Sequence, residues 1–303
     1  MFHESPELTV ATDFLLSPEA EPIRRMAESL YPTYLLAQRK RGRHVQPQPI
    51  PVLDEDFMTS AQGRWARILA EVTYSESTLR REGIDHTVVF FGSARIRAPG
   101  APEGSGTSAG DGPAATPAMA RFYDSCRELA KKLTAWSLEM GGGHGVQPFI
   151  VVTGGGPGIM EAGNRGAREA GGKTIGLNIT LPHEQQPNAY ITPEFNFHFH
   201  FFFTRKFHFS YRAKALVAFP GGFGTFDELF EILTLVQTRK ITKPFLLVLF
   251  GKEFWNRVVN FDYLVETGMV SKEDLRHFRV IDDVEEAFQI ITQHLKRFLK
   301  PGS

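Results

Sequence analysis

The segment HFFFTRKFHFSYRAKALVAFPGGFGTFDELFE, residues 200–231, decides the fold of this chain. It holds a short apolar run, Ala215–Phe219, which is typical of a buried parallel strand. The glycine-rich turn Gly221–Gly224 follows, and we expect a helix over Phe226–Gln237. A strand that ends in a glycine turn and opens a helix offers free backbone N–H groups to an anion, commonly a phosphate.

Charged residues flank this turn on both sides. A helix predicted over Phe202–Arg212 carries Arg205 and Lys206, and the acidic pair Asp227 and Glu228 follows the turn. A cation and a carboxylate beside a phosphate-binding turn indicate chemistry next to the phosphate rather than storage of it. Arg205 would also offset the repulsion between a carboxylate and a phosphate.

Strands and helices alternate from His86 to the end of the chain. This alternation predicts an α/β fold, a Rossmann-like doubly wound parallel sheet with helices on both faces. Ligands of such sheets bind beyond the carboxyl ends of the strands, where three loops should converge: Gly92-Ser93, Gly154–Gly158 and Gly221–Thr225. The expected strands are His86–Phe91, Phe149–Thr153, Lys173–Ile179, 195–201, Ala215–Phe219, Pro244–Leu249 and Arg279–Ile281, and the expected helices are Met119–Met140, Ile159–Ala170, Phe202–Arg212, Phe226–Gln237, Phe254–Val265 and Val284–Leu299.

We predict two parts, a helical N-terminal extension over residues 1–85 and a nucleotide-binding domain over residues 86–303. The extension should contain a helix from Ser17 towards Lys40 and another over Phe57–Arg81. We expect it to act as a helical cap or a dimer element without chemistry of its own. Residues 98–117 are rich in Gly, Pro, Ser and Ala, so we expect a flexible insert that leaves from the pocket edge of the sheet.

The composition excludes several classes of protein. Among 303 residues, 34 Lys and Arg balance 34 Asp and Glu, which gives no overall electrostatic case for binding nucleic acid or an anionic membrane. The single cysteine, Cys126, excludes an internal disulfide framework. No apolar run approaches the roughly 20 residues that a membrane helix needs. We therefore expect a soluble cytoplasmic protein that has neither nucleic acid nor membrane as a partner.

The second glycine loop, within VVTGGGPGIMEAG at residues 151–163, does not match the common nucleotide motifs. A dinucleotide fingerprint would need glycine where Ile159 or Glu161 stands, and a Walker A loop would need glycine at Ala167. What remains is a phosphate or ribose loop, or a tight turn that lets the next helix pack on the sheet. We favour the ligand loop, because three consecutive glycines exceed what a turn needs.

Other readings of the conspicuous residues are weaker. Thr225 and Glu228 form a capping-box pattern, which alone would explain Glu228. His198 and His200 share one strand face at a spacing that can bind metal, but no motif supplies further ligands, so we expect no metal. Cys126 lies mid-helix and no Gly-x-Ser-x-Gly elbow is present, so nucleophilic Ser or Cys hydrolysis is not expected.

The motif PGGFGTFDE, residues 220–228, together with Arg205-Lys206, resembles the LOG (Lonely Guy) family, long labelled lysine decarboxylases, whose pattern is PGGxGTxxE. The loops FGSAR (91–95) and GGGPGIMEAGNRGA (154–167) are similar to the longer bacterial members, which are related to AMP nucleosidases. The resemblance covers about residues 86–297. The insert at residues 98–117 departs from the family pattern.

This resemblance implies a phosphoribohydrolase that hydrolyses the N-glycosidic bond of AMP, or of N6-modified cytokinin-type AMP, to free base and ribose 5-phosphate. It implies no cofactor and a homodimer that shares residues across the pocket. Catalysis would fall to Arg205 and Glu228, and substrate binding to Gly221, Gly222, Gly224, Thr225, Lys206, Gly155, Gly156, Glu161, Ser93 and Arg95. Glu228 would stabilise charge at C1′ and orient water, Arg205 would stabilise the departing base, and Glu161 would bind ribose hydroxyls.

Two alternatives stay open at this point. The first is a carrier or sensor of the same fold that binds a nucleotide without catalysis. The second is the pyridoxal-phosphate decarboxylase of the older family label, which needs a Schiff-base lysine and a partner for the pyridine nitrogen. Lys206 abuts Arg205, and no such setting is visible around it.

Overall fold

The computed structural model describes residues 50–100, 115–142, 146–180 and 186–299. The chain divides into two compact units, Met1–Ser60 and Ala61–Ser303, and the predicted domain boundary at residues 85 and 86 stays a prediction. The helix expected from Ser17 to Lys40 and most of the expected flexible insert lie outside the described residues. In the first unit, Asp54 caps the short helix α4 (Glu55–Thr59) by accepting from Phe57 N at 3.0 Å.

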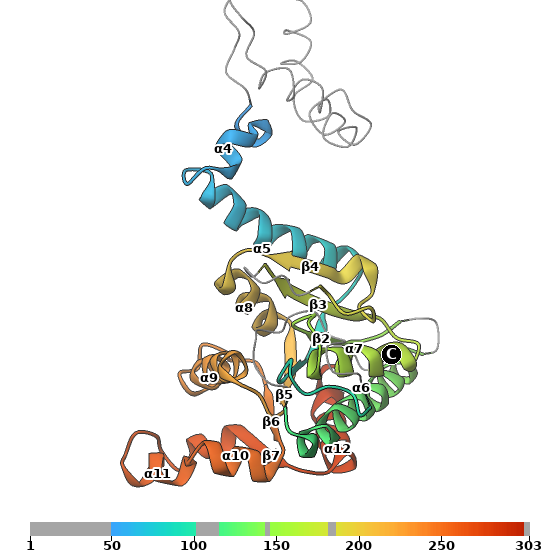
Figure 1. The fold of residues 1–303 in the computed structure, drawn as a ribbon, viewed down its shortest axis with the longest axis vertical. Helices are drawn as coiled ribbons and strands as arrows, with labels where there is room; N and C mark the ends of the chain where they lie inside the picture. Colours follow the sequence, from blue (N-terminus) through green and yellow to red (C-terminus); the bar gives the residue numbers. More distant parts are fainter. Residues whose placement is uncertain (1–49, 101–114, 143–145, 181–185, 300–303) are drawn as a thin grey trace, which may run out of the picture. The chain divides into compact units, whose positions relative to one another are not determined.

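The second unit is built on a seven-stranded parallel sheet with strand order β4-β3-β2-β1-β5-β6-β7 (Figure 1). The chain winds outward from β1 to β4, then returns to lie beside β1 and continues to β7. The strand order therefore reverses between β1 and β5, which is where doubly wound sheets bind their ligands. The strands are β1 (His86–Phe91), β2 (Phe149–Thr153), β3 (Thr174–Ile179), β4 (Asn196–Phe199), β5 (Ala213–Ala218), β6 (Leu246–Phe250) and β7 (Phe278–Ile281).

Helices cover both faces of this sheet, which confirms the predicted α/β class. Along β1 the side chains alternate, so that Val88 and Phe90 enter one core and Val89 and Phe91 the other. The first core is closed by α6 (Arg121–Met140), α7 (Ile159–Glu169) and α12 (Val284–Leu295). The second is closed by α5 (Arg64–Arg81), α8 (Phe202–Tyr211), α9 (Phe223–Gln237), α10 (Lys252–Val258) and α11 (Phe261–Glu266).

The described residues also contain short 3-10 helices: η2 (Pro51–Leu53), η3 (Pro117–Met119), η4 (Pro193–Phe195), η5 (Asp274–His277) and η6 (Lys296–Phe298).

The alternation of buried and exposed side chains predicted around β4 is confirmed, because Phe197 and Phe199 are buried while His198 is exposed. None of the helices among the described residues is long and apolar enough to cross a membrane, and the expected cytoplasmic location stays a prediction.

Some predicted helices have different bounds in the structure. The helix expected over Phe57–Arg81 is divided into α4 and α5, and the one expected over Phe254–Val265 is divided into α10 and α11. At the second break, Asn260 caps α11 by accepting from Tyr263 N at 2.9 Å. An Asn cap offers the backbone a local partner and so starts a new helix.

The start of α9 corrects one interpretation of the sequence. The helix begins at Phe223, three residues earlier than predicted, and its N-cap is Gly222. Thr225 therefore lies inside the first turn, where it cannot act as the N-cap residue, and the capping-box explanation of Glu228 is wrong. Glu228 lies in the second turn, so its carboxylate is not needed to cap the helix.

Candidate active site

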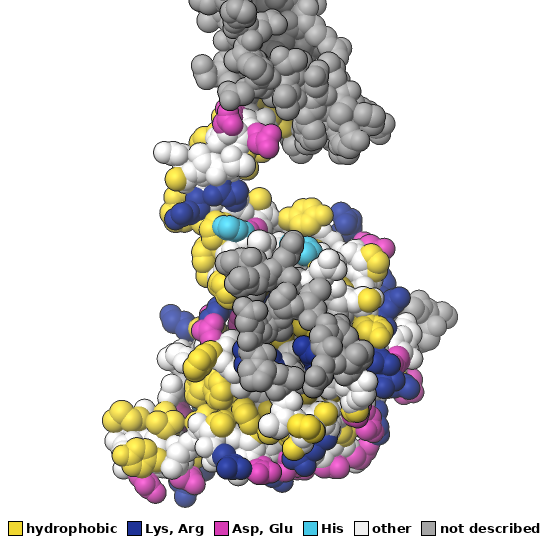
Figure 2. Space-filling view, viewed as in Figure 1, with side chains coloured by type: hydrophobic (Ala, Val, Ile, Leu, Met, Phe, Trp, Pro, Cys, Tyr) yellow, Lys and Arg dark blue, Asp and Glu magenta, His cyan; other side chains and the backbone are white. Residues whose placement is uncertain are grey.

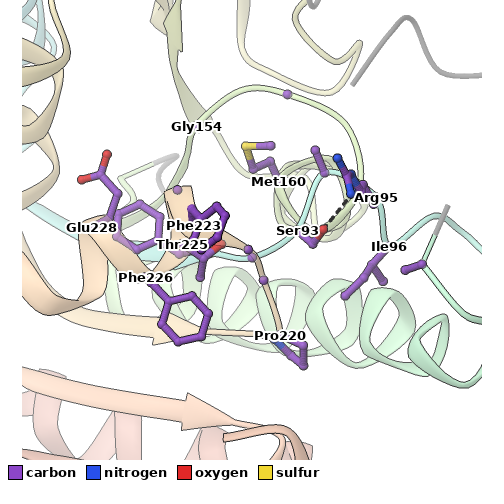
Figure 3. A pocket seen from close by; sticks show the side chains of 18 of the residues that line it. Ser93, Arg95, Ile96, Gly154, Met160, Pro220, Phe223, Thr225, Phe226 and Glu228 are labelled. Atoms are coloured by element: carbon purple, nitrogen blue, oxygen red, sulfur yellow. Dashed lines mark hydrogen bonds between the residues drawn. The ribbon is translucent and has the colours of Figure 1, made fainter. Parts of the chain in front are cut away.

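A cavity of about 980 Å³ opens at the carboxyl ends of the central strands. The loops after β1, β2 and β5 all contribute to its lining, as the sheet topology predicts. Figure 3 shows Glu228 on one side, Ser93 and Arg95 on the other, and Phe223 and Thr225 between them. Of the residues predicted to form the site, nine line the cavity: Ser93, Arg95, Gly156, Arg205, Gly221, Gly222, Gly224, Thr225 and Glu228.

The other three predicted site residues do not line the cavity. Lys206 Nζ instead contacts Asp227 at 2.8 Å and Glu231 at 2.9 Å, which ties α8 to α9. The Glu161 carboxylate accepts a hydrogen bond from Tyr123 at 2.6 Å. Gly155 is buried beneath the loop. The roles predicted for these residues in substrate binding stay predictions.

The turn after β5 presents bare backbone to the cavity. A Cβ atom on Gly221 would lie 2.1 Å from Thr225 Oγ1, so the turn folds tightly onto the first turn of α9. At Gly222 and Gly224 a Cβ atom would meet nothing within 4 Å, which leaves open space above the helix end. The first intrahelical bond runs from Phe226 N to Gly222 O, so the preceding N–H groups have no acceptor within the helix. This helix end can accept an anion.

Two of the glycines after β2 are required by close packing and a positive φ. Gly158 has a φ of +70°, and a Cβ atom there would lie 2.5 Å from Ser93 O. Ile159 N donates to the same carbonyl at 3.1 Å, so the loop packs closely on the turn after β1. Gly155 has a φ of +77° and approaches Asn178. Packing therefore explains two of these glycines, and Gly154 and Gly156 face the cavity.

Arg205 and Glu228 form a buried ion pair at one side of the cavity. Arg205 Nη2 lies 3.2 Å from Glu228 Oε1, and the two side chains are only 14% and 7% exposed. The guanidinium also lies against the rings of Phe202 and Phe209, 5.3 and 5.6 Å from their centroids. Among the described residues, Arg205 Nε has no hydrogen-bond partner, which leaves it a donor for a ligand.

Burial controls the protonation of this pair. It raises the pKa of the Glu228 carboxyl to about 7, although Arg205 and Lys206 oppose the shift. It also lowers the pKa of the Arg205 guanidinium, against the attraction of Glu228. Arg205 stays protonated at neutral pH, because the ordinary pKa of arginine lies far above it. Glu228 can therefore exist in both protonation states near neutral pH, which is a property suited to a catalytic carboxylate.

Apolar side chains form much of the remaining wall, and sequence reasoning did not assign them. They come from separate elements and include Ile96, Met119, Met160, Phe226 and Phe254. Rings and thioethers of this kind suit the faces of an aromatic ligand. In the sequence these apolar residues look like ordinary core residues. The available signal is that most of them follow the end of a strand.

Asn178 is another cavity residue that sequence reasoning missed. It lies near the carboxyl end of β3, and its Nδ2 donates to Asn196 Oδ1 at 2.7 Å and to Phe197 O at 3.0 Å. Its polar side chain near the end of a largely apolar strand was the sequence signal that could have predicted it.

Within the described ranges, no three His, Cys, Asp or Glu side chains come together as metal ligands would.

The segment at residues 98–117 begins just after Arg95 and Ile96, which line the cavity, and its second end lies at the cavity. Ala115 N donates to Arg95 O at 3.2 Å, and Ala115 and Thr116 belong to the lining. The second end of the segment thus rejoins the fold at the cavity.

Comparison with known proteins agrees with these features. Residues 160–291 match the model of the family described as "possible lysine decarboxylase". The chain is 27% identical over 185 residues to the cytokinin riboside 5′-monophosphate phosphoribohydrolase LOG2 of Arabidopsis thaliana, an alignment that covers 58% of this chain and 78% of that protein. It is 26% identical over 184 residues to the cytokinin riboside 5′-monophosphate phosphoribohydrolase of Mycobacterium tuberculosis, with 58% and 88% covered.

Among solved structures, the molybdenum cofactor carrier protein of Chlamydomonas reinhardtii aligns with 70% of this chain and 99% of its own, at 19% identity and a TM-score of 0.44. The family match includes β5, α9 and the PGGFGTFDE motif. These similarities support a relationship of the chain to the LOG family.

Proposed function

We propose that this protein hydrolyses the N-glycosidic bond of a nucleoside 5′-monophosphate, AMP or an N6-modified AMP, and releases the free base and ribose 5-phosphate. The observation that carries the proposal is the buried Arg205–Glu228 pair beside the free N-terminus of α9 in one cavity. The relatives named phosphoribohydrolases support the same reaction.

The phosphate would bind at the start of α9. The N–H groups of Phe223, Gly224 and Thr225 have no acceptor within the helix, and the dipole of this 15-residue helix favours an anion there. The open space above Gly222 and Gly224 lets phosphate oxygens approach the backbone closely. Binding of the phosphate at this point would fix the ribose above the second turn of the helix, where Glu228 lies.

Glu228 would act at C1′ of the ribose. As the bond to the base breaks, positive charge develops on the sugar ring, and an ionised carboxylate stabilises it and orients the attacking water. The water adds its oxygen to C1′, and its proton leaves with the base. Arg205, held against Glu228, would stabilise the electron pair that departs with the base.

The base would contact the apolar wall. Met160 and Phe226 line the cavity next to the glycine turns, and Ile96, Met119 and Phe254 extend the apolar lining. Such a wall accepts a purine face, and it also accepts an apolar N6 substituent. The lining therefore fits both AMP and N6-modified AMP, and a product assay distinguishes these two substrates.

We also infer that the protein forms a homodimer through α8. Phe203, Phe207 and Tyr211 follow one another at intervals of four residues, so they share a helix face, and they are 57%, 40% and 51% exposed. A row of exposed aromatic side chains is a common feature of a protein interface. Because α8 also carries Arg205, an interface there would adjoin the cavity.

A product assay tests the proposed reaction. The purified protein is incubated separately with AMP, GMP, CMP and prenyl-AMP, and free base and ribose 5-phosphate are quantified. We expect equimolar base and ribose 5-phosphate from an adenine nucleotide. Nucleotide binding without release of base from any of the four would contradict the proposal and favour a carrier or sensor.

A further inference from the structure

The helix that carries Arg205 lacks a cap of its own. The N-cap residue of α8 is Phe201, whose side chain accepts no hydrogen bond. Uncapped helix ends leave backbone N–H groups without partners, and these groups need an acceptor from elsewhere.

Glu71, on the distant helix α5, binds the backbone at the entry to this helix. Its carboxylate accepts from His200 N at 2.8 Å and from Phe201 N at 3.4 Å. It also accepts from the Thr204 hydroxyl at 2.6 Å. One side chain from before the first strand therefore holds the entry to α8 and Thr204, the residue next to Arg205.

The other end of α8 is held by the same helix. Arg212, the C-cap residue, donates from Nε to Glu76 Oε2 at 3.1 Å, and it also contacts Glu76 Oε1 and Ile84 O. The Arg212 and Glu76 side chains are 10% and 20% exposed. Two carboxylates five residues apart on α5 thus fix both ends of α8. Figure 1 shows α5 near β4 and α8.

Arg205 depends on this arrangement for its position. Its guanidinium touches Glu228 and the rings of Phe202 and Phe209, and both rings belong to α8 itself. Lys206 ties α8 to α9 through Asp227 and Glu231. The contacts with α5 hold both ends of α8, so the position of the helix that carries Arg205 depends on them as well.

We propose that Glu71 is a positioning residue for the reaction, and that α5 serves to hold Arg205 in place. This inference rests on the proposed function, in which Arg205 acts on the departing base. It gives the segment before the first strand a part in catalysis, although α5 contributes no side chain to the cavity lining. A shift of about 1 Å at a catalytic group lowers the rate by about a hundredfold.

Replacement of Glu71 tests the inference. We expect kcat for release of base to fall about tenfold to a hundredfold in Glu71→Ala, and less in Glu71→Gln, which keeps one acceptor oxygen. KM should stay within about threefold of the wild-type value, because the start of α9 is untouched. The matched control is Glu169→Ala, which removes a carboxylate that joins Arg127 on α6 to Arg165 on α7. An equal loss of kcat in both alanine variants, or no loss in Glu71→Ala, would overturn the inference.

A milder pair of variants covers the case in which Glu71→Ala does not fold. Thr204→Val keeps the shape of a buried side chain and removes its hydroxyl, whereas Thr204→Ser keeps the hydroxyl. We expect Thr204→Val to lower kcat by about fivefold to tenfold and Thr204→Ser to keep it near the wild-type value, since only the Ser variant keeps the hydroxyl that contacts Glu71 at 2.6 Å and Phe201 O at 2.8 Å. A Val variant as active as the Ser variant would contradict the inference.

Amide hydrogen exchange separates this inference from the proposed function. In Thr204→Val and in any folded Glu71 variant, the amides of His200 and Phe201 should exchange at least about threefold faster than in the wild type, because their acceptor is lost or loosened. If the wild type releases no base while this acceleration is seen, the proposed function fails and the role of Glu71 in holding α8 stands. Unchanged exchange overturns that role.

Discussion

The protonation of Glu228 is the property of a single residue on which the proposed reaction depends most. Its carboxyl is buried beside Arg205, and burial raises its pKa to about 7. A carboxylate that stabilises positive charge at C1′ must be ionised. The fraction of ionised Glu228 increases as the pH rises through that pKa.

Activity should therefore rise with pH through the neutral range. We expect kcat/KM to increase about tenfold per pH unit well below pH 7 and to level off above about pH 8, because kcat/KM reports groups of the free enzyme. A pH–rate profile between pH 5.5 and 9 measures this, and Glu253→Gln, an exposed carboxylate on α10, serves as a control that should keep the profile. A profile that is flat, or that falls through pH 7, would show that ionised Glu228 is not required.

The sequence predicted some site residues better than others, and the difference is physical. Arg205 and Glu228 were predicted from a motif, and the structure brings their side chains together. Lys206 and Glu161 were assigned to the ligand from the same kind of reasoning; in the structure Lys206 pairs with Asp227, Glu161 accepts from the Tyr123 hydroxyl, and their roles in ligand binding stay predictions. The partner that a charged side chain meets depends on the packing of helices far apart in sequence, and no local sequence pattern predicts that packing.

At the scale of the element, the start of α9 is the part of the fold that matters most. The alternation of strands and helices predicted the parallel sheet and placed the glycine turn at its edge. The first residue of α9 was predicted wrongly, because Thr225 and Glu228 mimic a capping box while the true N-cap, Gly222, has no side chain to signal it. The correction frees Glu228 from a structural role and so strengthens its candidacy for a chemical one.

Two glycine substitutions in this turn should have opposite effects. Gly224→Ala meets nothing within 4 Å and lies in a helix, where alanine is favoured, so we expect unchanged or higher thermal stability. Its methyl group would still intrude where phosphate oxygens approach, so KM for the nucleotide should rise about tenfold, the size of one lost interaction of roughly 1.4 kcal/mol. Gly221→Ala should instead lower the melting temperature, because its Cβ atom would meet Thr225 at 2.1 Å.

Thermal melting and steady-state kinetics of both variants decide this prediction. If Gly224→Ala keeps both its stability and its KM, then the phosphate does not bind at the start of α9. If Gly221→Ala melts like the wild type, the turn is less tightly packed on α9 than the geometry indicates.

At the scale of the whole molecule, exposed apolar side chains mark surfaces that other molecules can cover. Figure 2 shows hydrophobic side chains on more than one part of the visible face, including the region of α10 and α11. Met269, which follows α11, is 69% exposed. The row on α8 differs from this region because it lies on the helix that carries Arg205.

Charge placed in the α8 row should break the proposed homodimer. We expect the wild type to elute as a dimer in size-exclusion chromatography with light scattering, and Phe207→Glu to elute as a monomer, since a carboxylate in an apolar interface is costly to bury. Met269→Glu, a charge on an exposed apolar residue elsewhere, is the control and should stay dimeric. A monomeric wild type, or a Phe207→Glu variant that stays dimeric, would exclude α8 as the interface.

The most direct test of the account compares the wild type with Glu228→Gln for release of free adenine from AMP, with AMP binding and thermal melting measured in parallel. We predict that the wild type releases adenine, and that Glu228→Gln releases it at least about a hundredfold more slowly, because the amide cannot stabilise charge at C1′. The variant should bind AMP within about threefold of the wild-type affinity, since the start of α9 is unchanged. Near-normal release of adenine by Glu228→Gln would contradict the account.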